Sequence, residues 1–243
     1  MRITILTLFP EMFEGFLNTS IIKKARLKNI VEINVVDFRP FTEDKHTRVD
    51  EYPFGGGQGM VLMCQPILDA LKSVRKPESH VILTNPAGEQ YNQKIARELV
   101  KKDDIIILCG HYEGYDKRIS EYVDQEISIG DFVLTGGELP AMVITDSITR
   151  LVKGVISEDS TEDESFENDL LEYPQYTRPV DYEGHLVPEV LLSGHHENIR
   201  KFRLYESLKL TYQRRRDLLE KHQFTEEERK MLEKIIEEEE KNA

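Results

Sequence analysis

The sequence predicts an α/β fold, in which a mostly parallel sheet is covered by helices. Short apolar runs alternate with helical patterns through the first half of the chain, and such alternation is typical of parallel strands joined by crossover helices. The chain has 243 residues, of which 39% are hydrophobic. It can therefore bury a sizeable core, in one large domain or two modest ones.

The elements expected in the first half follow one another in order. Strands are predicted at RITILTLF (2–9), VEINVVDF (31–38), HVILTNPAG (80–88) and IIILCG (105–110). Helices are predicted up to about residue 28, over 66–74 and over 93–101. Ligands of parallel sheets bind beyond the carboxyl ends of the strands. We therefore expect a site among three loops, at 85–88, 110–114 and 128–137.

The second half of the chain changes character. Residues 139–152 are apolar on nearly every side, which predicts a buried helix. Residues 157–169 are polar and acidic without periodicity, and we interpret them as an interdomain linker, with a plain surface loop as the alternative. The remainder is mainly helical, and Thr225 with Glu228 forms a predicted capping box. The predicted parts are a first domain at 1–156, a linker at 157–169 and a helical domain at 170–243.

Composition argues against several classes of protein. No apolar run approaches the roughly 20 residues needed to cross a bilayer, and the N-terminal run is too short for a signal peptide. We therefore expect a cytoplasmic protein with no membrane partner. Cys64 and Cys109 form no CxxC pair, and the seven histidines show no ligand spacing. We expect reduced thiols and no metal site.

Charge is strongly segregated along the chain. The formal net charge of −13 argues against a nucleic-acid partner at first sight, but local patches decide whether phosphate is bound. The stretch RKFRLYESLKLTYQRRR, at 200–216, is basic with interleaved aromatic residues, and IIKKARLK near the N-terminus is a second basic cluster. Residues 158–172 hold no lysine or arginine. On charge alone, 200–216 is either a solvated helix face or an RNA-binding surface.

Two glycine-rich regions indicate close backbone approach to a ligand. YPFGGGQGM, at 52–60, is neither GxGxxG nor a P-loop. It is either a mobile turn or a flat surface for a flipped base or an RNA backbone. CGHYEGYDKR (109–118) and SIGDFVLTGGELPAM (128–142) place small or turn-forming residues beside apolar runs typical of buried strands. Such loops suit a flat ligand held by backbone groups.

Seven motifs in fixed order resemble the TrmD family of bacterial tRNA (guanine-N1)-methyltransferases, which are knotted SPOUT methyltransferases. They are LTLFPEMF, VDEYPFGGGQGM, NPAG, CGHYEGYD, SIGDFVLTGGELPAM, YPQYTRP and VLLSGHHENIRKFR. The resemblance implies S-adenosylmethionine (SAM) as methyl donor and, as acceptor, N1 of guanosine 37 of tRNA, immediately 3′ of the anticodon. It also implies a C-terminal trefoil knot in the first domain, an exception to ordinary topology. The resemblance further implies a homodimer whose active sites lie between the subunits. The partner it implies is tRNA and not DNA.

The chemistry calls for a base near N1 of guanine and a cation or donor near O6. Arg150 matches the arginine that the family places near O6. For the base, relatives typically read EDSF, whereas this chain reads TEDESFENDLL. Register with the family favours Glu164 and residue type favours Asp163, so both stay candidates. Asp50 is the next candidate and is also expected to contact the substrate.

The resemblance also assigns binding residues. The positions expected to bind SAM are Leu83, Asn85, Pro86, Gly88, Gly110, Tyr112, Glu113, Ser128, Ile129, Gly130, Leu134, Gly136, Gly137 and Pro140. The glycine-rich loop is expected to hold the guanosine, through Gly55, Gly56, Gly57 and Gly59. Charge segregation, and not the resemblance, selects the arginines expected to meet tRNA phosphates, which are Arg200, Arg203, Arg214 and Arg215.

Some questions stay open on sequence alone. His111 stands where relatives often carry arginine, so that any anion contact there would be weaker and pH-dependent. A magnesium requirement is left open. The alternatives to the main hypothesis are a SPOUT methyltransferase acting on another RNA and a non-catalytic RNA-binding protein.

Overall fold

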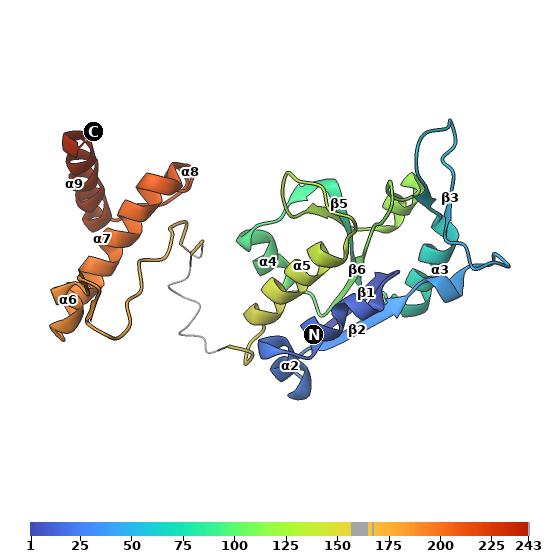
Figure 1. The fold of residues 1–243 in the computed structure, drawn as a ribbon, viewed down its shortest axis with the longest axis horizontal. Helices are drawn as coiled ribbons and strands as arrows, with labels where there is room; N and C mark the ends of the chain where they lie inside the picture. The colour runs from blue at the N-terminus through green and yellow to red at the C-terminus, as the bar shows by residue number, and fades with distance from the viewer. Residues whose placement is uncertain (157–164, 167, 243) are drawn as a thin grey trace. The chain divides into compact units, whose positions relative to one another are not determined.

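The computed structural model describes residues 1–156, 165–166 and 168–242. Contacts between Cα atoms divide the chain into two compact units, Met1–Glu158 and Asp159–Ala243 (Figure 1). Each unit is described below by itself. The two candidate bases, Asp163 and Glu164, and most of the predicted linker lie outside the described residues.

Unit 1 is built on a sheet whose strands all pair in parallel. The order is β2 (Glu32–Asp37), β1 (Arg2–Thr7), β6 (Asp104–Leu108), β5 (His80–Gln90) and β7 (Gln125–Ser128). Ile3 of β1 lies beside Ile33 of β2 on one side and Ile105 of β6 on the other. The mostly parallel α/β fold is thereby confirmed. The trefoil knot stays a prediction.

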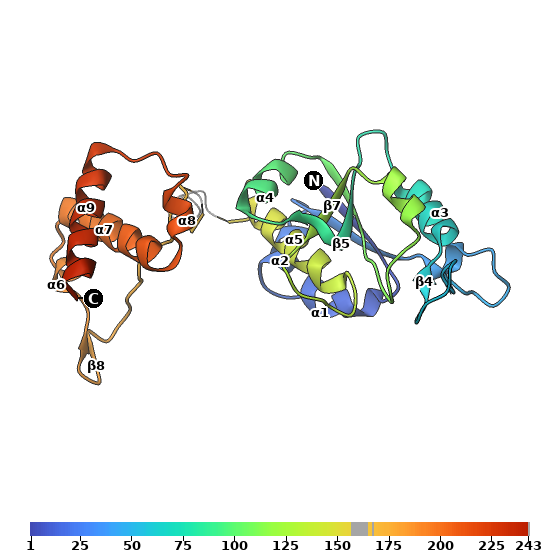
Figure 2. The ribbon, with the colours of Figure 1, turned by 90° about the horizontal axis from the view of Figure 1, so that it is seen from above.

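The central strands are apolar on both faces because helices cover both. Alternate residues of β6 enter two separate hydrophobic clusters, with Ile105 and Ile107 in one and Ile106 and Leu108 in the other. The first cluster is completed by α2 (Ser20–Leu27), α4 (Gln93–Leu99) and α5 (Glu138–Leu151), which lie together in Figure 2. The second is completed by α3 (Cys64–Val74). This layering explains the run of three isoleucines at 105–107.

Short elements complete unit 1. They are α1 (Glu14–Leu17), the 3₁₀ turns η1 (Pro10–Phe13), η2 (Arg39–Phe41) and η3 (Lys117–Tyr122), and an antiparallel pair of β3 (Asp50–Glu51) with β4 (Val61–Leu62). Asn92 caps α4, because its side-chain oxygen accepts a hydrogen bond from the amide of Ile95 at 3.1 Å. No helix among the described residues is long and apolar enough to span a membrane.

The apolar helix α5 is buried on one face only. Ala141, Ile144 and Ile148 are completely buried against the sheet. Leu139 and Val143 are 48% and 46% exposed. The sequence predicts a helix buried on nearly every side, but within this chain only the inner face of α5 is buried.

Unit 2 is mainly helical. It contains α6 (Glu189–Leu192), α7 (His196–Arg214), α8 (Arg216–Leu219), α9 (Glu226–Asn242) and a small hairpin of β8 (Asp181–Tyr182) with β9 (His185–Leu186). Its small core holds Leu170, Leu208 and Ile235. The predicted capping box at the start of α9 is confirmed, because the Glu228 amide donates to Thr225 Oγ1 at 3.2 Å and the Thr225 amide donates to Glu228 Oε2 at 2.6 Å.

Candidate functional site

A cavity of about 380 Å³ lies beside the middle of β5, where its pairing with β7 shifts register after Thr84, and at the carboxyl ends of β6 and β7. Its lining residues fall within 84–87, 110–115 and 127–140, the three regions where the sequence predicts ligand loops. Ligand pockets for small organic molecules usually measure roughly 300–1,000 Å³. The cavity is therefore large enough for a small organic ligand.

Most of the residues expected to bind a cofactor line this cavity. They are Asn85, Pro86, Gly110, Tyr112, Glu113, Ser128, Ile129, Gly130, Leu134, Gly136, Gly137 and Pro140. Leu83 and Gly88 lie behind the wall instead. Leu83 is 2% exposed within the sheet, and a Cβ on Gly88 would lie 2.5 Å from the backbone of Glu126. These two residues hold β5 against its neighbours and shape the cavity from behind.

Two loops of the cavity meet through their backbones at Gly137. The Gly137 amide donates a hydrogen bond to the carbonyl oxygen of Gly110 at 2.7 Å. A Cβ on Gly137 would lie 2.1 Å from Thr84 Oγ1 and 2.8 Å from Cys109 Cα. Because backbone atoms cannot move aside as a flexible side chain can, this contact requires glycine. It locks the start of α5 to the loop that follows β6.

The glycine-rich loop at 52–60 joins the cavity at Glu113. The Glu113 amide donates to the carbonyl oxygen of Met60 at 3.1 Å, and the Glu113 side chain packs over Gly59. Further out, Gly55 and Gly56 have φ angles of 88° and 79° and leave open space where a side chain would stand. The adjacent Phe54 is fully exposed. The glycine-rich loop at 52–60 and the cavity are therefore adjacent, and Glu113 contacts both.

A buried carboxylate lies beneath the loops. Glu138, the first residue of α5, is 2% exposed and accepts a hydrogen bond from Thr7 Oγ1 at 2.8 Å. Its second oxygen lies 3.9 Å from His111 Nδ1, and the His111 ring packs 4.8 Å from the ring of Tyr112. Burial, followed by the nearby Glu138, raises the pKa of the Cys109 thiol. Cys109 is therefore a protonated core residue.

Comparison with known proteins matches unit 1 and most of unit 2. A family model described as "tRNA (Guanine-1)-methyltransferase TrmD" matches residues 1–221. The chain belongs to this family.

Several relatives carry the name tRNA (guanine-N(1)-)-methyltransferase. The protein from Clostridium botulinum (strain Kyoto) is 59% identical, with 96% of this chain and 97% of the relative covered. The protein from Dictyoglomus turgidum is 55% identical, with 97% and 96% covered. The protein from Halalkalibacterium halodurans is 54% identical, with 99% and 100% covered.

Arg150 lies at the far end of α5 from the cavity. Pro140, in the first turn of α5, lines the cavity, and Arg150 follows ten residues later. At 1.5 Å per residue this separation is about 15 Å along the helix axis. Arg150 is half-buried and does not line the cavity of its own chain.

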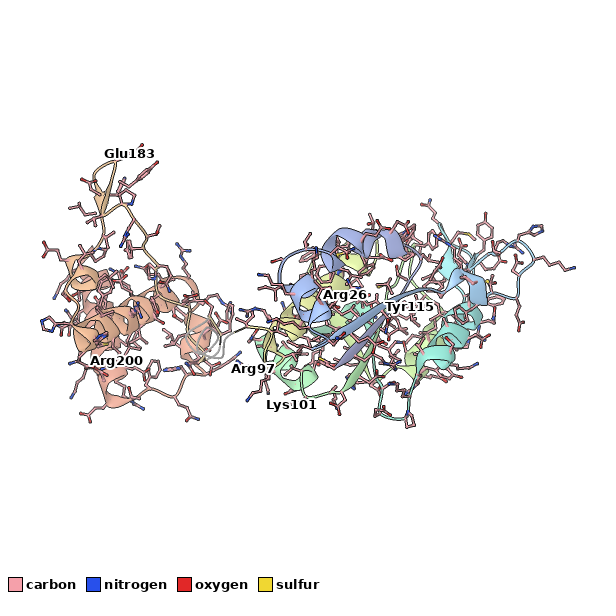
Figure 3. The ribbon with its side chains drawn as sticks, turned by 90° about the horizontal axis from the view of Figure 1, so that it is seen from below. Arg26, Arg97, Lys101, Tyr115, Glu183 and Arg200 are labelled. Atoms are coloured by element: carbon pink, nitrogen blue, oxygen red, sulfur yellow. The ribbon has the colours of Figure 1, made fainter. Side chains whose placement is uncertain are left out.

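The predicted phosphate-binding arginines of unit 2 lie on or directly after α7, and two of them are already paired. Arg200, labelled in Figure 3, contacts Glu197 and Glu227, each at 2.9 Å. Arg215 contacts Asp217 at 2.7 Å. Arg203 lies over the ring of Tyr173, with 4.8 Å between its guanidinium carbon and the ring centre, and Arg214 is exposed. A phosphate would therefore compete with carboxylates for two of these four side chains.

Sequence reasoning placed most of the cavity lining in the three predicted loops but did not assign every residue a binding role. Thr84, Tyr115 and Ile127 lie outside the predicted loops, and the lining residues inside them without an assigned role are Ala87, His111, Gly114, Phe132, Val133 and Thr135. Glu138 and Glu126 were also missed, although a carboxylate opening an apolar helix could have drawn attention to Glu138. Among the described residues, no three histidine, cysteine or acidic side chains gather as a metal site would require.

Proposed function

We propose that this chain transfers a methyl group from SAM to N1 of guanosine 37 of tRNA. The observation that carries the proposal is the cavity formed by residues 84–87 of β5 and by the glycine-bearing loops after β6 and β7, in a member of the TrmD family. The curated relatives named tRNA (guanine-N(1)-)-methyltransferase support guanine as the methylated nucleobase and tRNA as the substrate.

The cavity fits SAM in shape and in charge. Its walls are mainly backbone at Gly110, Gly136 and Gly137, which lets amides and carbonyls approach a flat adenosine. The Glu113 carboxylate lines the same cavity and suits the positively charged methionine end. When bound, SAM supplies an electrophilic methyl group. The protein must then hold the guanine and remove its proton.

The chain's own residues would perform the proton transfer. N1 of guanine is protonated at neutral pH, so a carboxylate, Glu164 or Asp163, takes the proton as N1 attacks the methyl group. The charge that develops on O6 is stabilised by Arg150. The glycine-rich loop, which meets the cavity at Glu113, holds the guanosine, with Asp50 of β3 beside it in the chain. We propose no magnesium ligands among the described residues.

We also propose that the active protein is a homodimer with shared sites. Arg150 and the cavity lie at opposite ends of α5, so a second copy is needed to bring an arginine to each cavity. The exposed Leu139 and Val143 provide an apolar surface on the same helix. An obligate interface should bury on the order of 2,000 Å² or more.

Mixing two inactive variants tests the shared site. Arg150→Ala keeps an intact cavity and Gly137→Val keeps an intact arginine, so a heterodimer contains one complete site only if the two act across the interface. Random pairing would then restore about a quarter of the wild-type activity. If the two residues act within one chain, the mixture stays inactive. Sedimentation equilibrium showing an active monomer would contradict the dimer itself.

Unit 2 is proposed as the tRNA-binding domain, with the linker at 157–169 connecting it to the catalytic unit. The basic residues of α7 and the aromatic rings between them support this assignment. A cytoplasmic location stays a prediction.

Labelled SAM and bulk tRNA test the proposed reaction directly. The protein is incubated with both, and the modified nucleoside is identified after digestion. We expect 1-methylguanosine, and its position in the tRNA is then mapped. A non-catalytic RNA-binding protein gives no label, and a methyltransferase with another target gives a different nucleoside.

A further inference from the structure

Three polar side chains from different elements meet at the wall of the cavity. Asn85 belongs to β5, Tyr115 follows β6, and Glu126 belongs to β7. Asn85 and Tyr115 line the cavity, whereas Glu126 does not. Tyr115 is labelled in Figure 3. Glu126 therefore acts on the cavity only through the other two residues.

The hydrogen bonds among these residues form a closed triangle. The Asn85 Nδ2 group donates to the Tyr115 hydroxyl at 2.7 Å and to Glu126 Oε2. The Tyr115 hydroxyl donates to the same Oε2 at 3.2 Å. The other carboxylate oxygen of Glu126 lies 3.3 Å from Lys117 Nζ. The Asn85 amide donates twice, the Tyr115 hydroxyl accepts once and donates once, and Glu126 Oε2 accepts twice, so every donor in the triangle has an acceptor.

The amide nitrogen and the oxygen of the Asn85 side chain are both engaged in hydrogen bonds within the protein. Both protons of its amide are committed to the triangle, and its Oδ1 accepts from the amide of Ala87 at 3.1 Å. This last bond fixes the turn that presents residues 85–87 to the cavity. Asn85 therefore has no side-chain donor left for a ligand, and its contribution is the placement of backbone.

The charges needed for the triangle are present at neutral pH. Burial, followed by the nearby Glu126, raises the pKa of the Tyr115 hydroxyl, which stays a donor. For Glu126, burial opposes ionisation, but hydrogen bonds from Ser120, Asn85 and Lys117 outweigh it and lower the pKa of the carboxyl. A carboxylate accepting from neutral donors makes a stronger hydrogen bond than a neutral acceptor would.

We propose that Glu126 is a positioning residue for the SAM pocket, which fixes the loops at 85–87 and 110–115 by holding Asn85 and Tyr115 together. The inference rests on the proposed function in that SAM is taken as the ligand. A residue of this kind should act on SAM affinity without touching the ligand or the tRNA.

A reversal of donors and acceptors tests this role. Asn85→Asp keeps the acceptor for the Ala87 amide but sets a second carboxylate against Glu126, and we expect SAM affinity to fall at least about tenfold. Glu126→Gln can keep an oxygen toward Asn85 and Tyr115 while its new amide group faces Lys117 and Ser120, so it loses an exposed ion pair and we expect a loss of less than about threefold. In the double variant, Asn85→Asp with Glu126→Gln, the new amide at position 126 donates to the new carboxylate at position 85, which reverses the original bond. Affinity should return to within about threefold of wild type.

Calorimetric titration with SAM gives the readout, and the thermal unfolding midpoint of each full-length variant is measured beside it. The steady-state KM for SAM should rise in Asn85→Asp more than kcat falls, with the KM for tRNA unchanged. Asn92→Asp is the matched control, because it adds the same charge to unit 1 while its side chain can still cap α4.

The outcomes separate the positioning role from the proposed function. If the double variant binds SAM no better than Asn85→Asp, the triangle does not set affinity and the inference is overturned. Should Asn85→Asp fail to fold, Tyr115→Phe removes one corner while keeping the ring, and wild-type SAM affinity in that variant would also overturn it. A wild-type protein that does not bind SAM contradicts the proposed function itself.

Discussion

The cavity of unit 1 and the basic surface of unit 2 are held together by different means. Around the cavity the decisive contacts are between backbone atoms, such as the Gly137 amide on the Gly110 carbonyl at 2.7 Å. On α7 they are between exposed side chains, such as Arg200, whose side chain is 49% exposed, and Glu197. Exposed ion pairs contribute little stability and weaken as the salt concentration rises. A close contact between backbone atoms is hardly affected by salt.

The two regions should therefore respond differently to substitution and to salt. The cavity should respond to changes of shape in an all-or-none manner and without regard to salt. The basic surface should respond in graded steps that depend on ionic strength.

Gly137→Val should abolish SAM binding, with a loss of affinity of about 100-fold or more, comparable to the loss of several buried contacts. The added side chain has no space, since its Cβ would lie 2.8 Å from Cys109 Cα. Calorimetry with SAM measures the effect. Gly15→Val is the control, because nothing lies within 4 Å of a Cβ there. Folded Gly137→Val protein that binds SAM normally would show that backbone contact does not govern the cavity.

Loss of the general base should slow methyl transfer by about 10²- to 10⁴-fold with SAM affinity nearly unchanged. Family register assigns the effect to Glu164→Gln and residue type assigns it to Asp163→Asn. Single-turnover rates on one tRNA decide between them, and calorimetry with SAM is the internal control. If both variants keep near-normal rates, neither carboxylate is the base, and Asp50→Asn becomes the next variant to measure.

The affinity for tRNA should fall with salt in proportion to the number of phosphate contacts. Removing one contact should flatten the slope of log affinity against log salt by about 0.7 to 0.9. We expect that full effect from Arg214→Gln and a smaller one from Arg200→Gln, because Glu197 and Glu227 already share the Arg200 guanidinium. Lys101→Gln in unit 1 is the control. Strong binding that is indifferent to salt would exclude this surface as the tRNA platform.

Much of the fold could be predicted from the sequence because its elements are strongly periodic. The central strand β6 is a continuous apolar run after Asp104, β1 alternates apolar residues with threonine, and α3 to α5 begin and end within a few residues of their predicted bounds. β7 was not delimited, since Gln125–Ser128 is only four residues long and begins with two polar residues. The pairs β3 with β4 and β8 with β9 have two residues per strand, too few for a periodic signal.

The candidate site was predictable where it depends on glycine and less so where it depends on charge. Glycines mark places where backbones approach closely, so the three loops stood out. Glu126 stands next to other polar residues and resembles a surface charge, whereas Glu138 opens an apolar helix and nothing in the sequence shows what it contacts. Their burial comes from residues far away in the chain, such as Thr7, which is 131 positions from Glu138. Only tertiary structure brings such partners together.

The smallest expected effect concerns the stability of unit 2. Thr225→Ala removes the Oγ1 that accepts from the Glu228 amide at the start of α9, and should lower the free energy of unfolding by about 1 kcal/mol. Urea unfolding of the full chain followed by circular dichroism measures it, with the exposed Thr177→Ala as control.

The same cap should depend on pH in a defined direction. Although burial opposes ionisation of Glu228, hydrogen bonds from the Thr225 amide and hydroxyl outweigh it and lower the pKa of this carboxyl from its ordinary value of 4.5. A lowered pKa in the folded state means that the stabilisation is complete above pH 4.5 and is lost as the pH falls through the folded pKa. The difference between wild type and Thr225→Ala should therefore shrink as the pH falls below about pH 4. A difference that stays the same at low pH would mean that the Thr225 hydroxyl stabilises α9 without any contribution from the Glu228 carboxylate, which accepts from the Thr225 amide and hydroxyl. The side-chain contacts of unit 2 would then not depend on charge, contrary to the comparison with unit 1.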